Sequence, residues 1–373
     1  MPRDRSVDAL RGLAITLVVL GHAILDSAAV LHAGPGMVDM GPFWVPLATA
    51  WSLPLNVLYS FHMPLFAFVS GFVMWPPRGR SIAEGVTSRA RSLLVPYLAW
   101  FGILYATNWS PHHAGGFGPA LIDALLGRDG LWFLYALFVS TAVVVCLERV
   151  PRSRWVLSFV ALVAVVSSSG WAFAVPNVLY LSDVLWIFPF VVLGYLMGPY
   201  KSQVIEHRWL VVALGCVAFV PLFILRYPVE VASLQPITRL LSESANPGAP
   251  GGAILGLAVS WLAVVLPYAC ACAAVAALCG LYLGREGGAI DVQAWLGRKS
   301  LGIYAMHGPV VWWLASHGVR EVFVLAGISL ALCVMATAIL ERIPLLGAVL
   351  LGQWRRPLSA DPEATHPGRD LAK

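Results

Sequence analysis

Charged residues are scarce in this sequence. Asp, Glu, Lys and Arg together make up 12% of the 373 residues, about half of the fraction that a soluble globular domain carries. Hydrophobic residues make up 59%, and the mean hydropathy is +0.78. No polar segment suggests an appended soluble domain, and no internal repeat is visible. These absences exclude a soluble enzyme. We expect an all-α polytopic membrane protein that has the lipid bilayer as a partner and no nucleic-acid partner.

Cysteine is also scarce, and all six cysteines lie in apolar runs. Their spacing matches no zinc site, and the predicted helices would hold them apart in the bilayer. We therefore expect neither a metal site nor a disulfide, and interpret these residues as small buried hydrophobic side chains. The six are Cys146, Cys216, Cys270, Cys272, Cys279 and Cys333.

Ten apolar runs are separable, and each is a candidate for a membrane-spanning helix. The first spans about twenty residues and carries ionisable residues through its middle, so we do not expect a cleavable signal peptide. Ten spans put both termini on one side of the membrane. The predicted spans are roughly 9–30, 55–75, 92–109, 131–147, 155–175, 181–198, 209–225, 253–283, 301–316 and 322–341.

The basic residues test this count. Of the 24 Lys and Arg residues, 20 fall on the N-terminal side and four on the other side, namely Arg128, Arg226, Arg239 and Arg320. A wrong number of spans would mix the two groups. Because positive residues gather on the cytoplasmic side, we expect both termini to be cytoplasmic and the protein to be a multi-pass protein of the bacterial inner (cytoplasmic) membrane type.

The predicted membrane domain comprises residues 1–343, and residues 344–373 form a cytoplasmic tail. The tail begins with an apolar stretch that suits the membrane surface, and its last ~15 residues have a composition typical of disorder. The run 253–283 contains Pro267 and predicts one long, tilted or kinked helix. Three longer outer loops suit irregular caps over a cavity mouth, because they are rich in Gly, Pro, Trp and His. They are 31–54, 110–130 and 226–252.

An arginine and a histidine mark the first predicted span. Arg11 and His22 are eleven residues apart, about three full turns plus ~20°, so both lie on one face, roughly 16 Å apart along the axis. Asp8 and Asp26 fall near the same stripe, three residues before Arg11 and four after His22. Ionisable groups at membrane depth usually face a bundle interior and mark a functional path. The alternative is that Arg11 anchors the helix at the interface and His22 is a satisfied core histidine.

His62 lies where the second predicted span is interrupted. Pro64 disfavours helix at Met63 and suits a helix that begins near Leu65. Backbone groups freed by such a break need protein or water around them, so His62 is a candidate for a site within the membrane. The Ser70-Gly71 pair that follows supplies a small surface for close helix packing.

A second polar stripe lies on the ninth predicted span. Ser300, Tyr304 and His307 follow the spacing i, i+4, i+7 and share one helix face. His307 lies about 10 Å along the axis from Ser300. A third intramembrane histidine on such a stripe argues against an inert bundle.

Two further stretches admit two interpretations each. Arg89 and Arg91 lie at the start of the third span. They can bind an anion through their positive charge and through paired hydrogen bonds, but positive residues at a cytoplasmic helix end also set topology. Trp132 and Tyr135 open the fourth span, where they suit either an interfacial aromatic belt or stacking on the face of a sugar.

Together these stretches resemble the membrane acyltransferase family three, the polytopic O-acyltransferases of bacterial glycans and some secondary metabolites. The motifs come in the family's order and cover both halves of the bundle. FHMPLF is most similar to the stand-alone sugar acetylases, including the fucose 4-O-acetylase-like group. The matching stretches are Arg11 to His22 after Asp8, FHMPLFAFVSG at 61–71, RARSLLVPY at 89–97, LWFLYALF at 131–138 and GRKSLGIYAMH at 297–307.

The resemblance implies transfer of an acyl group, expected to be acetyl, from cytoplasmic acyl-CoA to a hydroxyl of a saccharide or glycan, often on the extracytoplasmic side. The family's essential first-helix histidine corresponds to His22, and its arginine to Arg11. Its third-helix basic pair corresponds to Arg89 and Arg91, although the spacing here is R-x-R where R-x-x-R is usual. Glycan-assembly proteins are further candidate partners.

The expected mechanism joins a cytoplasmic donor site to an outer acceptor site. His22 would remove the acceptor's proton as a general base, and Tyr304, Ser300 or His62 would stabilise the developing oxyanion. A covalent acyl-histidine is an open alternative. The expected site residues are His22, Asp26 and His62 for catalysis, Arg11, Arg89 and Arg91 for acetyl-CoA or another acyl-CoA, and Trp132, Tyr135, Ser300, Tyr304 and His307 for the substrate.

Functions of two other classes are also compatible with these residues. A proton-coupled transporter would use the histidines as a proton relay. Such a transporter predicts broken helices at corresponding positions of two repeats, whereas this sequence has one clear break, near Pro64, and no repeat. A glycan-export or assembly partner without acyl-transfer chemistry predicts that replacing His22 leaves function intact.

Overall fold

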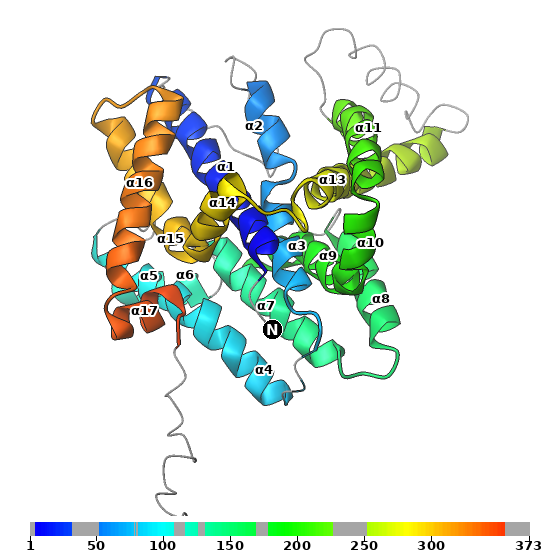
Figure 1. Cartoon of the computed structure of the whole chain (residues 1–373), viewed down its shortest axis with the longest axis horizontal. Helices are drawn as coiled ribbons and strands as arrows, with labels where there is room; N and C mark the ends of the chain where they lie inside the picture. Colours follow the sequence, from blue (N-terminus) through cyan, green and yellow to red (C-terminus); the bar gives the residue numbers. More distant parts are fainter. Residues whose placement is uncertain are drawn as a thin grey trace, which may run out of the picture.

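The computed structural model describes residues 4–31, 52–77, 79, 81–107, 116–125, 131–168, 178–226 and 252–354. All regular secondary structure in these ranges is helical, as the sequence predicted (Figure 1). The first half contains α1 (Arg5–Leu31), α2 (Ser52–Tyr59), α3 (His62–Phe72), α4 (Ile82–Arg89), the π-helix η1 (Ala90–Leu94), α5 (Val95–Ala106), α6 (Phe117–Leu125), α7 (Trp132–Leu147) and α8 (Ser153–Ser167). The second half contains the 3₁₀ turns η3 (Val178–Tyr180) and η4 (Gly198–Tyr200) and the helices α9 (Leu181–Met197), α10 (Lys201–Glu206), α11 (Arg208–Arg226), α13 (Gly252–Tyr282), α14 (Gly288–Arg298), α15 (Ser300–Ser316), α16 (Val322–Leu340) and α17 (Pro344–Leu351).

Among the described residues, six helices are long and apolar enough to cross a membrane. The chain is therefore an integral membrane protein. Four more predicted spans correspond to the shorter helices α5, α7, α8 and α15, of 12, 16, 15 and 17 residues, so the count of ten spans stays a prediction. The six candidate spans are Arg5–Ser27, Leu53–Phe72, Leu181–Glu206, Arg208–Arg226, Val264–Tyr282 and Val322–Leu340.

Helix α1 lies at the centre of the bundle and packs against α3, α14, α15 and α16 (Figure 1). Its closest neighbour is α14, a helix that the search for apolar runs did not predict. A Cβ on Gly12 would lie 1.8 Å from the carbonyl oxygen of Gln293, so only glycine allows the two backbones to approach this closely. This contact places the end of α14, with Arg298, beside the Arg11 end of α1.

Two local predictions about helix continuity are confirmed. The second span is interrupted at Ser60–Phe61, and His62 is the first residue of α3. The break falls one turn earlier than the start near Leu65 that Pro64 suggested, because a proline fits well within the first turn of a helix. Residues Gly252–Tyr282 form one helix of 31 residues that includes Pro267. Helix α3 packs on the backbone of α9 at Gly71, which confirms the predicted packing role for Gly71, whereas Ser70 lines the cavity described below.

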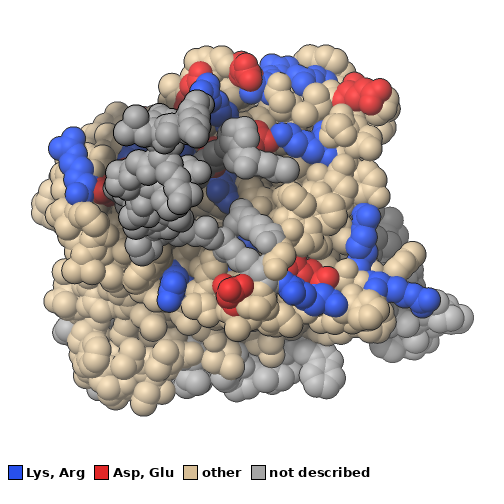
Figure 2. Space-filling view, turned by 60° about the horizontal axis from the view of Figure 1, so that its bottom comes forward, with Lys and Arg blue, Asp and Glu red and all other residues tan. Residues whose placement is uncertain are grey.

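Polar contacts join segments that the charge pattern assigns to the same side of the membrane. Lys201 forms an ion pair with Asp4, and Arg5 forms one with Asp291 at 3.4 Å. At the other end of α1, the Ser27 hydroxyl donates to the Arg320 carbonyl oxygen at 2.7 Å. Figure 2 shows separate groups of basic and acidic side chains on a surface that is otherwise mostly uncharged. The cytoplasmic location of the termini stays a prediction.

The start of the predicted tail is helical. Helix α17 packs against α5 and α16, and its last two residues, Leu350 and Leu351, are buried. The segment 117–125, inside an outer loop that we expected to be irregular, is also a helix. The rest of that loop, most of the loops 31–54 and 226–252, and the last 15 residues lie outside the described residues.

Candidate functional site

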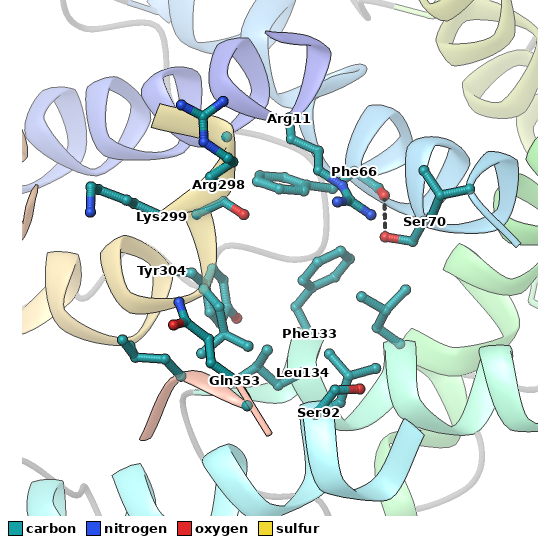
Figure 3. A pocket seen from close by; sticks show the side chains of 18 of the residues that line it. Arg11, Phe66, Ser70, Ser92, Phe133, Leu134, Arg298, Lys299, Tyr304 and Gln353 are labelled. Atoms are coloured by element: carbon teal, nitrogen blue, oxygen red, sulfur yellow. Dashed lines mark hydrogen bonds between the residues drawn. The ribbon is translucent and has the colours of Figure 1, made fainter. Parts of the chain in front are cut away.

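A cavity of about 760 Å³ lies between α1, α3, α7, α15 and the ends of α4, α14 and α17 (Figure 3). This volume falls within the range typical of small-molecule and cofactor sites. Apolar and polar side chains both contribute to the walls. The lining residues are Arg11, Phe66, Ser70, Val73, Arg89, Ser92, Leu93, Phe133, Leu134, Leu137, Thr141, Trp295, Gly297, Arg298, Lys299, Ser300, Leu301, Tyr304, Glu341, Leu351, Gly352 and Gln353.

One part of this lining is strongly basic. It contains four cationic side chains, Arg11, Arg89, Arg298 and Lys299, against one carboxylate, Glu341. Lys299 forms an ion pair with Glu341, so the positive excess comes from the three arginines. Arginine forks match phosphate and carboxylate oxygens. This part of the cavity therefore suits an anionic ligand.

Arg11 is held in place from its own helix. Its guanidinium lies 3.6 Å from the Asp8 carboxylate, one turn earlier, and its side chain reaches into the cavity beside Phe66 and Ser70 (Figure 3). Asp8 is buried, so this ion pair helps to orient the Arg11 side chain.

The two predicted arginines of the third span lie at the junction of α4 and the π-helix η1: Arg89 is the last residue of α4, and Arg91 is the second residue of η1. Arg89 lines the cavity, whereas the Arg91 guanidinium lies over the ring of Trp354, 5.9 Å from its centroid. Trp354 Nε1 also donates to the Arg91 carbonyl oxygen at 2.8 Å. Arg91 is thus engaged by the C-terminal segment. Single π turns inside α-helices often mark functional positions, and no residue pattern predicted this one.

Three aromatic rings of the lining form a continuous row. The centroids of Phe66 and Phe133 are 5.8 Å apart, and those of Phe133 and Tyr304 are also 5.8 Å apart. The next ring beyond Tyr304 is that of His307, at 5.6 Å. A lining residue of the cavity, Tyr304, is therefore in ring contact with a histidine on the same helix, α15.

Beyond these rings lie the three predicted histidines. The ring of His307 meets that of His22 edge-to-face, with centroids 4.7 Å apart and an interplanar angle of 73°. His62 is close enough to both to interact with them electrostatically. Only 5% of His62 and 6% of His307 is exposed, so neither faces lipid. Helices α1, α3 and α15 thus bring the histidines into one cluster.

Backbone carbonyls fix the tautomers of two of these histidines. His307 Nδ1 lies 2.6 Å from the Tyr304 carbonyl oxygen, and His62 Nδ1 lies 2.9 Å from the Leu58 carbonyl oxygen. A carbonyl only accepts, so each neutral ring carries its hydrogen on Nδ1 and leaves Nε2 as an acceptor. His307 Nε2 is buried and has no hydrogen-bond partner among the described residues. It is available to a donor group from a substrate.

Asp26 is placed one turn beyond His22, on the same helix. No hydrogen bond joins the two side chains, although the structure describes both. Asp26 instead interacts electrostatically with Tyr59 of α2, whose ring lies 4.7 Å from that of His62. Asp26 therefore contributes charge to the edge of the cluster and does not contact His22 directly.

The predicted substrate-binding residues divide between two places. Ser300 and Tyr304 line the cavity, and His307 lies just beyond it. Trp132 packs against Trp186 at 6.5 Å, and Tyr135 packs against Tyr97 and Tyr180 at 5.8 and 5.5 Å. Neither ring is part of the cavity lining. The face of α7 that lines it carries Phe133, Leu134, Leu137 and Thr141.

No group of three or more His, Cys, Asp or Glu side chains in the described part of the chain is arranged to hold a metal ion. The fold and the site together define an integral membrane protein with a basic, ligand-sized cavity, and a lining residue of this cavity contacts a cluster of three histidines. Residues 4–340 match the family described as Acyltransferase domain (Acyl_transf_3). The chain therefore belongs to this acyltransferase family, as its motifs predicted.

Two curated relatives carry the name nodulation protein NolL. The protein from Mesorhizobium japonicum is 30% identical over 232 residues, which cover 58% of this chain and 55% of the relative. The protein from Sinorhizobium fredii is 26% identical over 230 residues, which cover 58% of this chain and 57% of the relative. The chain thus spans little more than half the length of these relatives. No solved structure matches it.

Proposed function

We propose that this protein is a membrane O-acyltransferase that moves an acyl group, expected to be acetyl, from cytoplasmic acyl-CoA to a hydroxyl of a saccharide or glycan on the extracytoplasmic side. One observation carries the proposal: a row of three aromatic rings connects the arginine-lined cavity with a cluster of three histidines. Family membership gives acyl transfer, and the cavity suggests how donor and base meet.

The donor's phosphates would bind at the basic part of the cavity. Arg11, Arg89 and Arg298 come from three different elements, so the positive charge of the cavity is not that of a single helix end. The thioester arm would extend along the axis of α1 from Arg11 toward His22. The two residues are roughly 16 Å apart along a helix, a distance that an extended arm spans.

The proposed chemistry uses His22 as the general base. It takes the proton of the acceptor hydroxyl as the hydroxyl oxygen attacks the thioester carbonyl carbon. The carbonyl becomes an oxyanion, which Tyr304 or Ser300 would stabilise by donating a hydrogen bond. The carbon–sulfur bond then breaks, the CoA thiolate takes the proton from His22, and the acyl group stays on the acceptor oxygen.

His307 and His62 support this step as hydrogen-bond acceptors. The free Nε2 of His307 suits the acceptor hydroxyl or an N–H of His22, since both are donors. His62, fixed in the same tautomer, would orient the hydroxyl from the other side. A route through a covalent acyl-histidine at His22 uses the same residues and differs in having two transfers.

Two measurements test the function as a whole. The first compares cell-surface glycans and secreted small molecules, by mass spectrometry, from cells with and without the gene. A constant mass gain on one species, present only with the gene, identifies the acyl group and the acceptor together. The second is binding of acetyl-CoA to the purified protein. A proton-coupled transporter or an export partner predicts no such binding and no mass gain.

A further inference from the structure

The C-terminal end of the described chain builds part of the cavity, although it lies beyond the family match. The match ends at residue 340, whereas Leu351, Gly352 and Gln353 line the cavity. We call Pro344–Trp354, which comprises α17 and the next three residues, the C-terminal wall. Gln353 lies across the cavity from Arg11, on the same side as Ser92 (Figure 3).

Side-chain contacts tie this wall to the helical run that carries Arg89. Trp100 Nε1 of α5 donates to the Leu350 carbonyl oxygen at 2.9 Å. Trp354 Nε1 donates to the Arg91 carbonyl oxygen, and the Arg91 guanidinium covers the Trp354 ring within cation–π range. The wall is therefore fixed both to α5 and to η1.

Gly352 allows the wall to lie directly on the π turn. Its φ is +65°, and a Cβ there would lie 2.5 Å from the Ser92 carbonyl oxygen, so a larger residue would be strained and would push the wall away. Ser92 in turn donates to the Arg89 carbonyl oxygen at 3.2 Å. A continuous path of contacts thus leads from Gly352 to the residue that presents a guanidinium to the cavity.

Gln353 connects the wall to the acidic group of the cavity. Its Nε2 donates to Glu341 Oε1 at 3.1 Å, while Glu341 Oε2 pairs with Lys299. Gln353 therefore helps to hold this carboxylate in its pairing with Lys299. A carboxylate that turned from Lys299 toward the cavity arginines would compete with an anion for them.

We propose that the C-terminal wall is a positioning element of the acyl-CoA site. It fixes the π turn that presents Arg89 and, through Gln353, the pairing of Glu341 with Lys299. This inference rests on the proposed function, because acyl-CoA is the ligand whose binding the wall would set. Loss of a wall contact should weaken donor binding and leave the acceptor site and the histidine chemistry unchanged.

The test compares Trp354→Ala with Trp209→Ala in the full-length protein. Trp209 lies against Arg285, with the guanidinium 5.4 Å from the ring centroid, so its removal breaks the same kind of contact at residues that do not line the cavity. Trp354→Phe keeps a ring for Arg91 and loses the N–H. Binding of a non-hydrolysable acetyl-CoA analogue, kcat, and KM for acetyl-CoA and for the acceptor are measured at equal membrane abundance.

Trp354→Ala should weaken analogue binding and raise KM for acetyl-CoA by roughly tenfold, the size expected for one lost cation–π contact and one lost hydrogen bond. The values of kcat and acceptor KM should stay near wild type. The KM of Trp354→Phe for acetyl-CoA should lie between the values for Trp354→Ala and wild type. The KM of Trp209→Ala should equal that of wild type. Arg91→Ala combined with Trp354→Ala should cost less than the sum of the two single changes, because both remove the same contact.

A wild-type protein that fails to bind the analogue would overturn the proposed function and this inference together. A wild-type protein that binds it, with Trp354→Ala and Gly352→Ala binding equally tightly, would overturn the positioning role alone. If both variants reach the membrane poorly, analogue binding is measured with Gln353→Ala instead, because this variant leaves the Trp354 contacts in place. Unchanged analogue binding in that variant would also contradict the inference.

Discussion

His22 and His307 lie edge-to-face, with ring centroids 4.7 Å apart, although they belong to the first helix and to α15. One ring shares a helix face with the cavity arginine Arg11, and the other adjoins the cavity residue Tyr304. The two rings therefore connect the polar residues of α1 with those of α15. This relationship turns two polar stripes into one candidate reaction centre and leads to four predictions.

The first prediction concerns His22. His22→Ala should insert and fold, because the side chain is only half-buried and its loss removes one ring contact, with His307. It should abolish acyl transfer, because alanine cannot accept a proton. A general base of this kind contributes about 10² to 10⁴ in rate. The measurement is the rate of transfer at equal membrane abundance. Activity within a few-fold of wild type would rule out His22 as the base.

The second prediction separates the two nitrogens of His307. His307→Asn places an amide N–H near the Tyr304 carbonyl oxygen, which keeps the donor role of Nδ1, and removes the free Nε2 acceptor. We expect normal abundance, an acetyl-CoA KM near wild type and a kcat lowered by about tenfold to a hundredfold, as for loss of one hydrogen bond to a buried group. A kcat equal to that of wild type would mean that Nε2 has no role in transfer.

The third prediction concerns the cavity arginines. Arg11→Lys and Arg89→Lys keep the charge, and so the topology, while they lose the forked contact with phosphate. Each should raise KM for acyl-CoA by roughly tenfold to a hundredfold, equivalent to about 1.5–3 kcal/mol, and leave acceptor KM nearly unchanged. Steady-state kinetics with each substrate varied in turn provides the measurement. If neither variant changes the dependence on acyl-CoA, these arginines serve topology only, and the donor site moves toward Arg298 and Lys299.

The fourth prediction ranks Asp26 below His22. Asp26 lies beside Tyr59 and makes no hydrogen bond with the His22 ring in the described structure, so Asp26→Asn should change transfer less than His22→Ala does. We expect a loss of less than about tenfold, since only a nearby charge is removed. A loss as complete as that of His22→Ala would instead assign Asp26 a direct part in proton transfer.

The polar stripes of the first and ninth predicted spans could be read from the sequence because helical spacing alone puts Arg11 near His22, and Ser300 near Tyr304 and His307. Their meeting could not be derived, since it depends on how α1 packs against α15. The break before His62 followed from Pro64, because proline restricts the backbone of its neighbours whatever the tertiary context.

Other parts of the site depend on information that the spacing does not hold. Positions 89 and 91 differ by about 200° around a helix, so only one of the two arginines can face a cavity, but the sequence does not say which. Helix α7 is apolar all round, and such a helix carries no signal for its inward face. Trp132 and Tyr135 therefore seemed better candidates than Phe133. Helix α14 was missed because it is short and carries charges, so no apolar run marks it.

The central claim is that acyl-CoA is the donor and that His22 performs the transfer. The most direct measurement follows the acyl group itself: purified protein in lipid nanodiscs is incubated with acetyl-CoA labelled in the acetyl group and with saccharides extracted from cells that lack the gene. We predict that wild-type protein moves the label into an alkali-labile ester on a saccharide, and that His22→Ala, at equal protein concentration, does not. Label that stays on CoA with the wild-type protein, or that reaches the saccharide equally fast with His22→Ala, would contradict the account.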